Sequence, residues 1–238
     1  VNAADPAKVM QKFLPAQPKG RTIIVGCGKG AAQMAQAFER LWSGPVEGAV
    51  VTRYGFGAKC DRIEVLEASH PVPDASGLAA SERLIGQVTG LTKEDLVIAL
   101  ICGGGSALLP APADGLTLED EIAVNKELLA SGAPISAMNA IRKHISRIKG
   151  GRLAALAYPA KVVSLIVSDI PGDIASYVAS GPTVPDINTR HDALRLIEQY
   201  GMTFPEAVMR HMHSDACAAP HPSDPVFAWN ETHIIASA

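Results

Sequence analysis

The chain has 238 residues, and its 21 lysines and arginines against 24 aspartates and glutamates give a formal net charge of −3. This balance excludes a protein held to nucleic acid or to an anionic membrane by overall charge. Hydrophobic residues make up 47% of the chain, enough to bury a core, so wholesale disorder is excluded. The four cysteines are far apart, which argues against a disulfide framework and fits a reducing, cytoplasmic compartment.

Six short apolar runs predict β-strands. Each run is too short for a comfortable helix and lacks polar alternation, which is typical of a strand covered on both faces. The runs occupy residues 22–25, 49–52, 63–66, 96–102, 162–167 and 232–236.

Five segments with helical spacing of apolar residues alternate with these runs, at 31–42, 77–88, 118–129, 135–148 and 192–200. Thr117 and Asp120 are spaced like a capping box, and Gly132 and Gly201 stand where a helix would end in a left-handed residue. The alternation predicts βαβ units with right-handed crossovers. We therefore expect an α/β fold, a three-layer, Rossmann-like, mostly parallel sheet with helices on both faces.

No membrane-spanning or targeting segment is expected. The charge-free stretch 96–113 contains three consecutive glycines and two prolines, which a transmembrane helix would not tolerate easily. The first residues show no basic segment followed by an apolar run, so no secretory signal is expected. The sequence begins at Val1 instead of Met and stops at Ala238 directly after an apolar run, which suggests cut ends and a missing downstream segment.

A glycine-rich turn, VGCGKGA at residues 25–31, follows the first predicted strand and opens an alanine-rich helix. Glycines such as Gly28 let backbone amides approach a ligand, and a helix N-terminus stabilises an anion. Lys29 would add a full positive charge there. Because the spacing completes neither GxGxxG nor the P-loop pattern, a plain strand-to-helix turn stays an alternative.

A second glycine turn, CGGGSAL at residues 102–108, ends the fourth predicted strand. In an open α/β sheet, ligands bind at the carboxyl edge of the strands. Three consecutive glycines cost backbone entropy, so Gly103, Gly104, Gly105 and Ser106 are candidates for backbone binding of an anion. A nucleophilic serine is a less favoured alternative, because Leu108 stands where the GxSxG pattern needs its last glycine.

The tract 139–152 carries five lysines and arginines and no acid, and no acid occurs from Leu128 to Ser168. Apolar residues at three- and four-residue steps predict that the cations share one helical face. The functional interpretation is recognition of phosphate or carboxylate, with Asn139, Arg142 and Lys149 as candidates. The alternative is a solvated basic face.

Two carboxylates, Asp169 and Asp173, follow the fifth predicted strand in the turn SDIPGD. Their spacing, in a turn stiffened by Pro171 and opened by Gly172, suits ligation of Mg²⁺ or acceptance of a proton from a hydroxyl. The competing explanation for either aspartate is structural: its side chain would only bond to nearby backbone N–H groups in an Asx turn.

Two further segments receive a structural interpretation. Residues 202–229 are rich in proline and histidine and poor in periodicity, so a surface excursion or an approach to a linker is expected. Their series His211, His213, Cys217 and His221 resembles metal ligands, but the irregular context argues against a site. The string HPVPD at 70–74 predicts a stiff turn towards the same sheet edge, leading into a helix capped by Asp74 or Ser76.

In order and spacing, five of these strings resemble the glycerate 2-kinases whose second lobe is called the MOFRL domain. They are VGCGKGA at 25–31, SHPVPD at 69–74, CGGGSALL at 102–109, SGAPISAMNAIRKHISRIKGGRLA at 131–154, and SDIPGD with SGPTVPD at 168–186. The resemblance covers nearly the whole chain. It implies that residues 1–238 form the family's large amino-terminal α/β domain and that the carboxyl-terminal MOFRL lobe is absent from the chain.

The resemblance implies transfer of the γ-phosphoryl group of ATP to the 2-hydroxyl of D-glycerate, giving 2-phosphoglycerate and ADP. It implies ATP and Mg²⁺ as cofactors and D-glycerate as the partner, with no nucleic acid or membrane; homo-oligomer formation is left open. By position, the family's essential lysine corresponds to Lys29, and its paired catalytic and metal-binding aspartates correspond to Asp169 and Asp173. The family's further arginine and acid in the other lobe have no counterpart here.

Two other functions compete with the kinase. Some members of the family are labelled hydroxypyruvate reductases, which makes an NAD(P)H-dependent reductase the first alternative. It lacks a complete GxGxxG and an acid that ends the second strand, since Asp61 lies too far along. A non-catalytic, anion-binding fragment, separated from its other lobe, is the second alternative.

Overall fold

The computed structural model describes residues 6–237. Its centre is one six-stranded sheet with the order β3-β2-β1-β4-β5-β6, and all five strand pairings are parallel. The strands are β1 (Thr22–Cys27), β2 (Glu47–Arg53), β3 (Glu64–Ala68), β4 (Leu96–Cys102), β5 (Lys161–Ser168) and β6 (Glu231–Ser237). The six predicted strands are confirmed, and so is the α/β class. Val1 and Ala238, which prompted the expectation of cut ends, lie outside the described residues.

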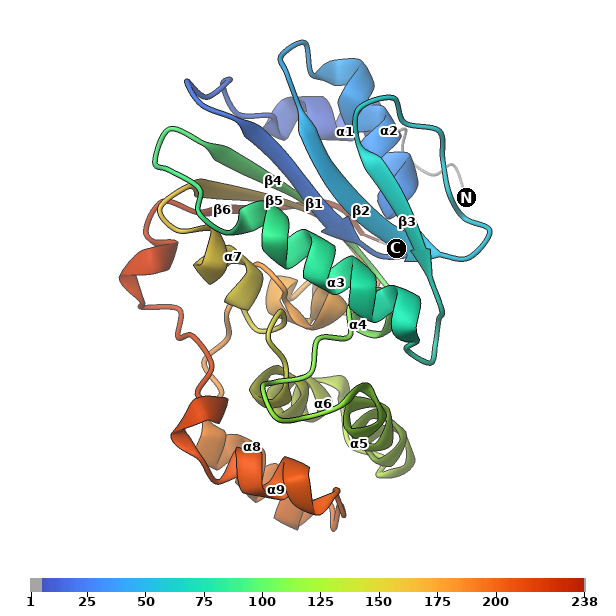
Figure 1. Ribbon diagram of the computed structural model, residues 1–238, viewed down its shortest axis with the longest axis vertical. Coiled ribbons are helices and arrows are strands. Elements are labelled where there is room, and N and C mark those ends of the chain that lie inside the picture. Colours follow the sequence, from blue (N-terminus) through green and yellow to red (C-terminus); the bar gives the residue numbers. More distant parts are fainter. Residues whose placement is uncertain (1–5, 238) are drawn as a thin grey trace.

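The burial pattern explains why the central strands read as unbroken apolar runs. Every residue of β1 and β4 is buried, because helices cover both faces of the sheet. The edge strand β6 is exposed over much of its length. The first face is covered by α1 (Pro6–Met10) and α2 (Ala31–Leu41), and the other by α3 (Ala75–Val88) and α7 (Arg152–Ala157) (Figure 1).

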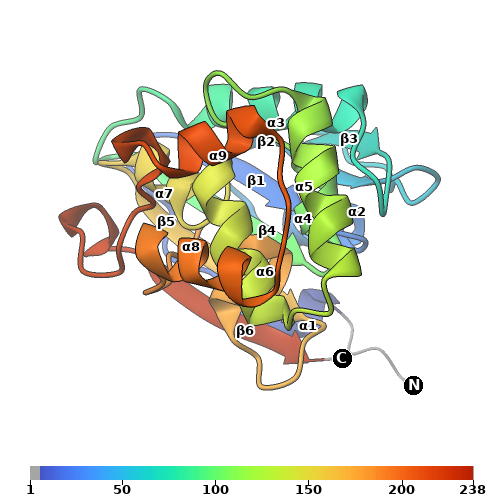
Figure 2. The same ribbon diagram turned by 90° about the horizontal axis from the view of Figure 1, so that it is seen from below.

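A third group of helices forms its own layer beneath the face that carries α3 and α7 (Figures 1 and 2). It consists of α5 (Leu118–Ala130), α6 (Ile135–Arg142), α8 (Arg190–Gln199) and α9 (Glu206–Met212). These helices enclose a separate apolar cluster. The expectation that 202–229 is a surface excursion is therefore wrong for its first part, because Phe204, Val208 and Met212 are buried in this cluster.

The helix expected at 135–148 is shorter than its periodicity predicts. The α-helix ends at Arg142, and a 3-10 turn at Lys143–Ile145 follows. There the chain turns Lys143 and His144 into the interior, where Lys143 pairs with Asp186 and the His144 ring donates to the carbonyl of Cys217. Pairing with distant parts of the chain thus overrides the local helical pattern.

The predicted helix ends are confirmed. Thr117 and Asp120 form a reciprocal capping box at the start of α5, and Asp74 caps α3 by accepting from the Gly77 N–H. Gly132 and Gly201 have positive φ angles of 70° and 59° directly after α5 and α8. Short elements complete the fold: α4 (Gly105–Leu108) and 3-10 turns at Gln11–Phe13, Ala175–Ser180, Asp215–Cys217 and Pro225–Phe227. No helix within 6–237 has the length and apolar character needed to span a bilayer.

Candidate functional site

The first glycine turn joins β1 to α2 at the carboxyl edge of the sheet. Gly28 has a φ of 127°, which favours glycine, and its N–H donates to the carbonyl of Val51 at 3.0 Å. The next N–H, that of Lys29, donates to the carbonyl of Gly103 at 2.9 Å. The backbone of Lys29 is thereby fixed against the second glycine turn, while its side chain is exposed.

The second glycine turn leaves β4, the neighbour of β1 in the sheet. A side-chain carbon at Gly103 would overlap with the carboxylate oxygen Oδ2 of Asp169. At Gly104, which has a φ of 87°, such a carbon would lie 3.0 Å from Cγ and Cε of Lys29 and 3.2 Å from Nε2 of His70. The absence of side chains at these two glycines is what lets the side chains of Asp169, Lys29 and His70 approach one backbone turn.

Asp169 comes from a third strand. It follows β5 directly, and β5 is the other neighbour of β4. Lys29, the triple glycine and Asp169 therefore follow three adjacent strands, β1, β4 and β5. The order of the sheet reverses between β1 and β4, so this is the topological switch point where open α/β sheets bind ligands. We call Lys29, Gly103–Gly105, His70 and Asp169 the rim.

Asp173, four residues after Asp169, is held by partners outside the rim. Its Oδ2 accepts from the Ser237 hydroxyl at 2.6 Å, so it is tied to the end of β6. Hydrogen bonds from Ser237 and then Ser168 hold the pKa of Asp173 below its usual range. Neither the Lys29 side chain nor the glycine turn is among its hydrogen-bond partners within 6–237.

Asn139, Arg142 and Ser106 form a buried polar network that reaches the glycine turn. The hydroxyls of Ser106 and Ser180 lie 2.7 Å apart, and Ser180 donates to Oδ1 of Asn139 at 2.9 Å. Arg142 donates to the same Oδ1 at 3.2 Å and to Asn125 at 2.8 Å. Burial lowers the pKa of the Arg142 guanidinium. The network joins α5 and α6 to α4, the short helix that follows β4.

Lys149 does not join this group. Its side chain is 1% exposed, and its ammonium donates to Glu121 at 2.5 Å and to the carbonyl of Leu109 at 2.9 Å. Lys143 is similarly buried against Asp186. The basic tract is thus not a solvated face, because Arg142, Lys143 and Lys149 lie in the interior. The acids that pair with the two lysines come from distant parts of the sequence.

Two residues that contact the glycine turns, His70 and Cys102, were not among the candidates taken from the sequence. His70 was placed near the sheet edge, but its approach to Gly104 depends on side-chain direction. Burial, with the charges of Lys29 and Arg53, holds the pKa of His70 below its ordinary value, so its ring is neutral at pH 7. Cys102 accepts the Gly30 N–H at its sulfur, 3.1 Å away, and burial raises the pKa of its thiol to about 11.

The described side chains do not form a complete metal site. No cluster of three or more His, Cys, Asp or Glu side chains that could hold a metal occurs in the described part of the chain. This includes the series from His211 to His221, where His211 donates to the carbonyl of His144 and His221 bonds to Ser223. Mg²⁺ commonly takes one or two carboxylates together with phosphate oxygens and water, and the exposed Asp169 fits that pattern.

Comparison with known proteins identifies the family to which the chain belongs. Residues 1–213 match the model of a family described as a domain of unknown function (DUF4147). A protein of Agrobacterium vitis that carries the provisional name hydroxypyruvate reductase is 52% identical over 208 residues, which are 87% of this chain and 48% of that protein. A D-glycerate 2-kinase of Thermotoga maritima is 41% identical over 212 residues, 88% of this chain and 51% of that protein.

The fold agrees with a solved kinase. The crystal structure of a Thermotoga maritima glycerate kinase matches with a TM-score of 0.86 at 38% identity, over 97% of this chain and 55% of that one. The chain thus spans about half the length of the relatives it matches. The resemblance drawn from the five motifs is confirmed: the chain belongs to the DUF4147 family and has glycerate 2-kinases among its homologues.

Proposed function

We propose that this chain is the phosphate-binding α/β domain of a glycerate 2-kinase, which transfers the γ-phosphoryl group of ATP to the 2-hydroxyl of D-glycerate. The observation that carries the proposal is the approach of Lys29, the triple glycine and Asp169 at the carboxyl ends of three adjacent strands. Phosphoryl transfer needs mainly positioning and neutralisation of charge, and these groups are of the types that supply both. The names of the kinase relatives support the same reaction.

Lys29 and the second glycine turn would bind the phosphates. The lysine side chain is exposed at the rim, so its ammonium can neutralise charge on the transferred group. Backbone N–H groups of Gly103 to Ser106 would donate to phosphate oxygens, and Gly28 permits the close approach of the first turn. The hydrogen bond from the Lys29 N–H to the Gly103 carbonyl holds the first and second glycine turns together.

Asp169 would take the acidic role. It lies against Gly103, where it could ligate Mg²⁺ or accept the proton of the attacking hydroxyl. When bound, the metal would neutralise charge that develops on the phosphate oxygens. Asp173, tied to Ser237, would act as a second carboxylate at the edge of the same site.

Arg142 and Asn139 would recognise the substrate carboxylate or a phosphate through the network that ends at Ser106. Arg142 is 8% exposed, and its two partners within the described residues are side-chain amide oxygens instead of carboxylates. A buried guanidinium that lacks a carboxylate partner suits an anionic ligand. Lys149 is not included in this role, because its ammonium already has Glu121.

The test is release of ADP by the full-length protein with D-glycerate and Mg-ATP. We expect Lys29→Ala to lower kcat at least 100-fold, the loss of about 2.7 kcal/mol that removal of one electrostatic donor to a transition state costs. Lys59→Ala, which removes an exposed lysine from the loop after β2, is the matched control. Turnover that is unchanged by Lys29→Ala would remove the role given to this lysine.

A second measurement uses the 238-residue chain by itself. If this chain binds Mg-ATP without turnover, and addition of the remaining lobe restores turnover, the chain alone is a non-catalytic domain.

A hydroxypyruvate reductase is the second candidate, because the strand order β3-β2-β1-β4-β5-β6 is also that of dinucleotide-binding sheets. β2 ends at Arg53, where an NAD-binding protein would place an acid, and Arg53 instead stacks 3.5 Å over Phe56. An arginine there is compatible with NADPH. Oxidation of NADH or NADPH by hydroxypyruvate, with no release of ADP from Mg-ATP and D-glycerate, would establish the reductase in place of the kinase.

A further inference from the structure

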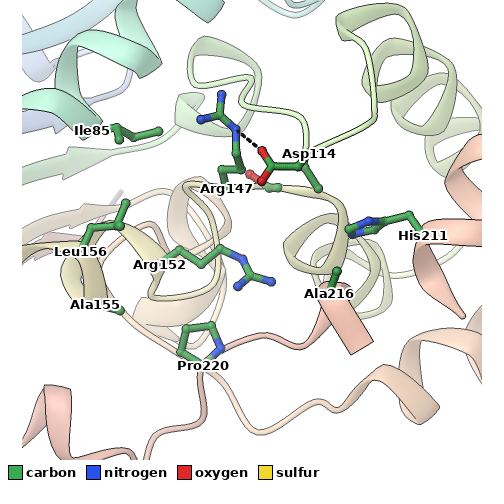
Figure 3. A pocket seen from close by; sticks show the side chains of 11 residues that line it. Ile85, Asp114, Arg147, Arg152, Ala155, Leu156, His211, Ala216 and Pro220 are labelled. Carbon is green, nitrogen blue, oxygen red and sulfur yellow. Dashed lines mark ion pairs between the residues drawn. The ribbon is translucent and has the colours of Figure 1, made fainter. Parts of the chain in front are cut away.

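A cavity of about 430 Å³ lies away from the rim, between α3, α7 and the segment that follows α9 (Figure 3). Ile85, Ala155, Leu156 and Pro220 give it an apolar wall. The guanidinium of Arg152 points into the space from α7. Its volume lies within the range of about 300–1,000 Å³ that is typical of small-molecule sites. None of the rim residues lines it, so it is a separate feature of the molecule.

Arg152 differs from the other cations of the basic tract. Lys143, Arg147 and Lys149 each pair with a carboxylate, and Arg142 is held by side-chain amides near the second glycine turn. Arg152 has no carboxylate partner in the described chain, and it faces a cavity. The charge of Arg152 is therefore the uncompensated positive charge in the wall of this cavity.

The hydrogen bonds of Arg152 hold its side chain in place but leave donors unused. Nε donates to the carbonyl of Lys143 at 3.4 Å, and Nη2 donates to the carbonyls of Cys217 and Ala218 at 3.3 and 3.0 Å. Nη1 has no partner within 6–237. Burial lowers the pKa of this guanidinium, which shows that its surroundings disfavour the charge. A ligand that supplied negative charge would remove that penalty.

Two other charged side chains line the cavity, Arg147 and Asp114. Arg147 pairs with Glu82, and its Nε lies 3.8 Å from Asp114 at the cavity wall. His211 faces the cavity with its ring held by a hydrogen bond from Nε2 to the carbonyl of His144. Glu82 is not among the lining residues, and the charges of Arg147 and Asp114 are opposite, so Arg152 leaves the lining with a net positive charge.

We propose that this cavity is a second ligand site, which binds a small organic oxyanion, a carboxylate or a phosphate monoester with a short apolar part, through Arg152. The planar guanidinium would hold the two oxygens of the head group, and the wall of Ile85, Ala155 and Leu156 would contact the apolar part. Because the cavity shares no residue with the rim, its ligand would bind together with the substrates of the rim.

The experiment measures binding of two probes, hexanoate and inorganic phosphate, to the full-length protein by isothermal titration calorimetry. Arg152→Gln removes the charge and Ala155→Phe fills the cavity while Arg152 stays in place. Each should weaken binding at least tenfold. Arg195→Gln, which removes an arginine that is 77% exposed on α8, is the matched control and should leave the affinity unchanged. Lys29→Ala separates phosphate bound at the rim from phosphate bound in the cavity.

The outcomes separate the head groups and the sites. Binding of hexanoate alone would identify a carboxylate ligand, and binding of phosphate alone would identify a phosphate ester, provided that both cavity variants lose it. Equal affinity in the wild type, Arg152→Gln and Ala155→Phe would overturn the proposal. So would binding that is lost only in Lys29→Ala, or no binding of either probe by the wild type. None of these results depends on the kinase assay.

Discussion

At the scale of single residues, the candidate site depends on the absence of a side chain at Gly103 and at Gly104. Asp169 occupies the space that a side chain at Gly103 would need, and Lys29 and His70 pack around Gly104. The motifs predicted that the glycines, Lys29 and Asp169 lie at one edge of the sheet, because the carboxyl ends of parallel strands share that edge. They did not predict which side chain fills which space, since this depends on the local backbone. His70 and the sulfur of Cys102 were missed for that reason.

Replacement of Gly103 by alanine tests this use of space. The methyl group would displace the Asp169 carboxylate, so we expect kcat for ADP release to fall at least 100-fold, with a smaller change in KM for Mg-ATP. Gly86→Ala is the control. It lies inside α3 with open space around it, so it should keep full activity and raise the free energy of unfolding by about 0.5–1 kcal/mol. Equal activities of the two variants would refute the role of the close approach at Gly103.

At the scale of elements, local patterns in the sequence predicted the strands and most helices. Where the chain departs from these patterns, the cause is pairing between side chains far apart in the sequence. The apolar runs defined all six strands, and the capping box at Thr117 marked the start of α5. The basic tract looked like one long amphipathic helix, yet the chain turns inward after Arg142 to bury Lys143 and Lys149. Their acids, Asp186 and Glu121, are 43 and 28 residues away, a pairing that no local pattern reveals.

The pair of Lys149 and Glu121 should support the contact between α5 and the loop before α7. Lys149→Met leaves the Glu121 carboxylate, 3% exposed, without its cation, so we expect the free energy of unfolding to fall by about 3–5 kcal/mol in urea titrations. The same change at an exposed pair, Arg83→Met opposite Glu64, should cost about 0–1 kcal/mol. The double variant Lys149→Met with Glu121→Gln should cost less than Lys149→Met alone. Similar losses for the Lys149 and Arg83 variants would show that the buried pair contributes little.

At the scale of the whole molecule, one parallel sheet holds the rim at its carboxyl edge, and a separate helical layer connects to it through the network from Arg142 to Ser106. The sequence predicted the three-layer sheet. It did not predict that layer, because its core combines residues from Val124 to Met212 that share no continuous pattern. The buried His144 and the half-buried His70 are also expected to make the stability of the fold depend on pH.

His144 and His70 should destabilise the protein as the pH falls. Burial lowers the pKa of both histidines below the ordinary 6.5. As the pH falls from 7 to 5, these histidines therefore take up protons more readily in the unfolded chain than in the folded chain, which favours unfolding. The free energy of unfolding should therefore fall with decreasing pH, by at most about 1.4 kcal/mol per pH unit for the buried His144 and by less for the more exposed His70.

Urea titrations from pH 5 to 8 measure this slope. His144→Asn should reduce it, because the buried imidazole is removed, whereas His213→Asn, at an exposed histidine, should leave it unchanged. A slope that is the same in the wild type and in His144→Asn would show that His144 does not cause the effect.

The crystal structure of the full-length protein with Mg²⁺ and a non-hydrolysable ATP analogue tests the rim most directly. We expect the β- and γ-phosphates to contact the ammonium of Lys29 and the backbone N–H groups of Gly103 to Ser106, with the metal beside Asp169. Phosphates that lie beyond contact of both glycine turns, for example on Arg152, would contradict the assignment of the rim as the phosphate site.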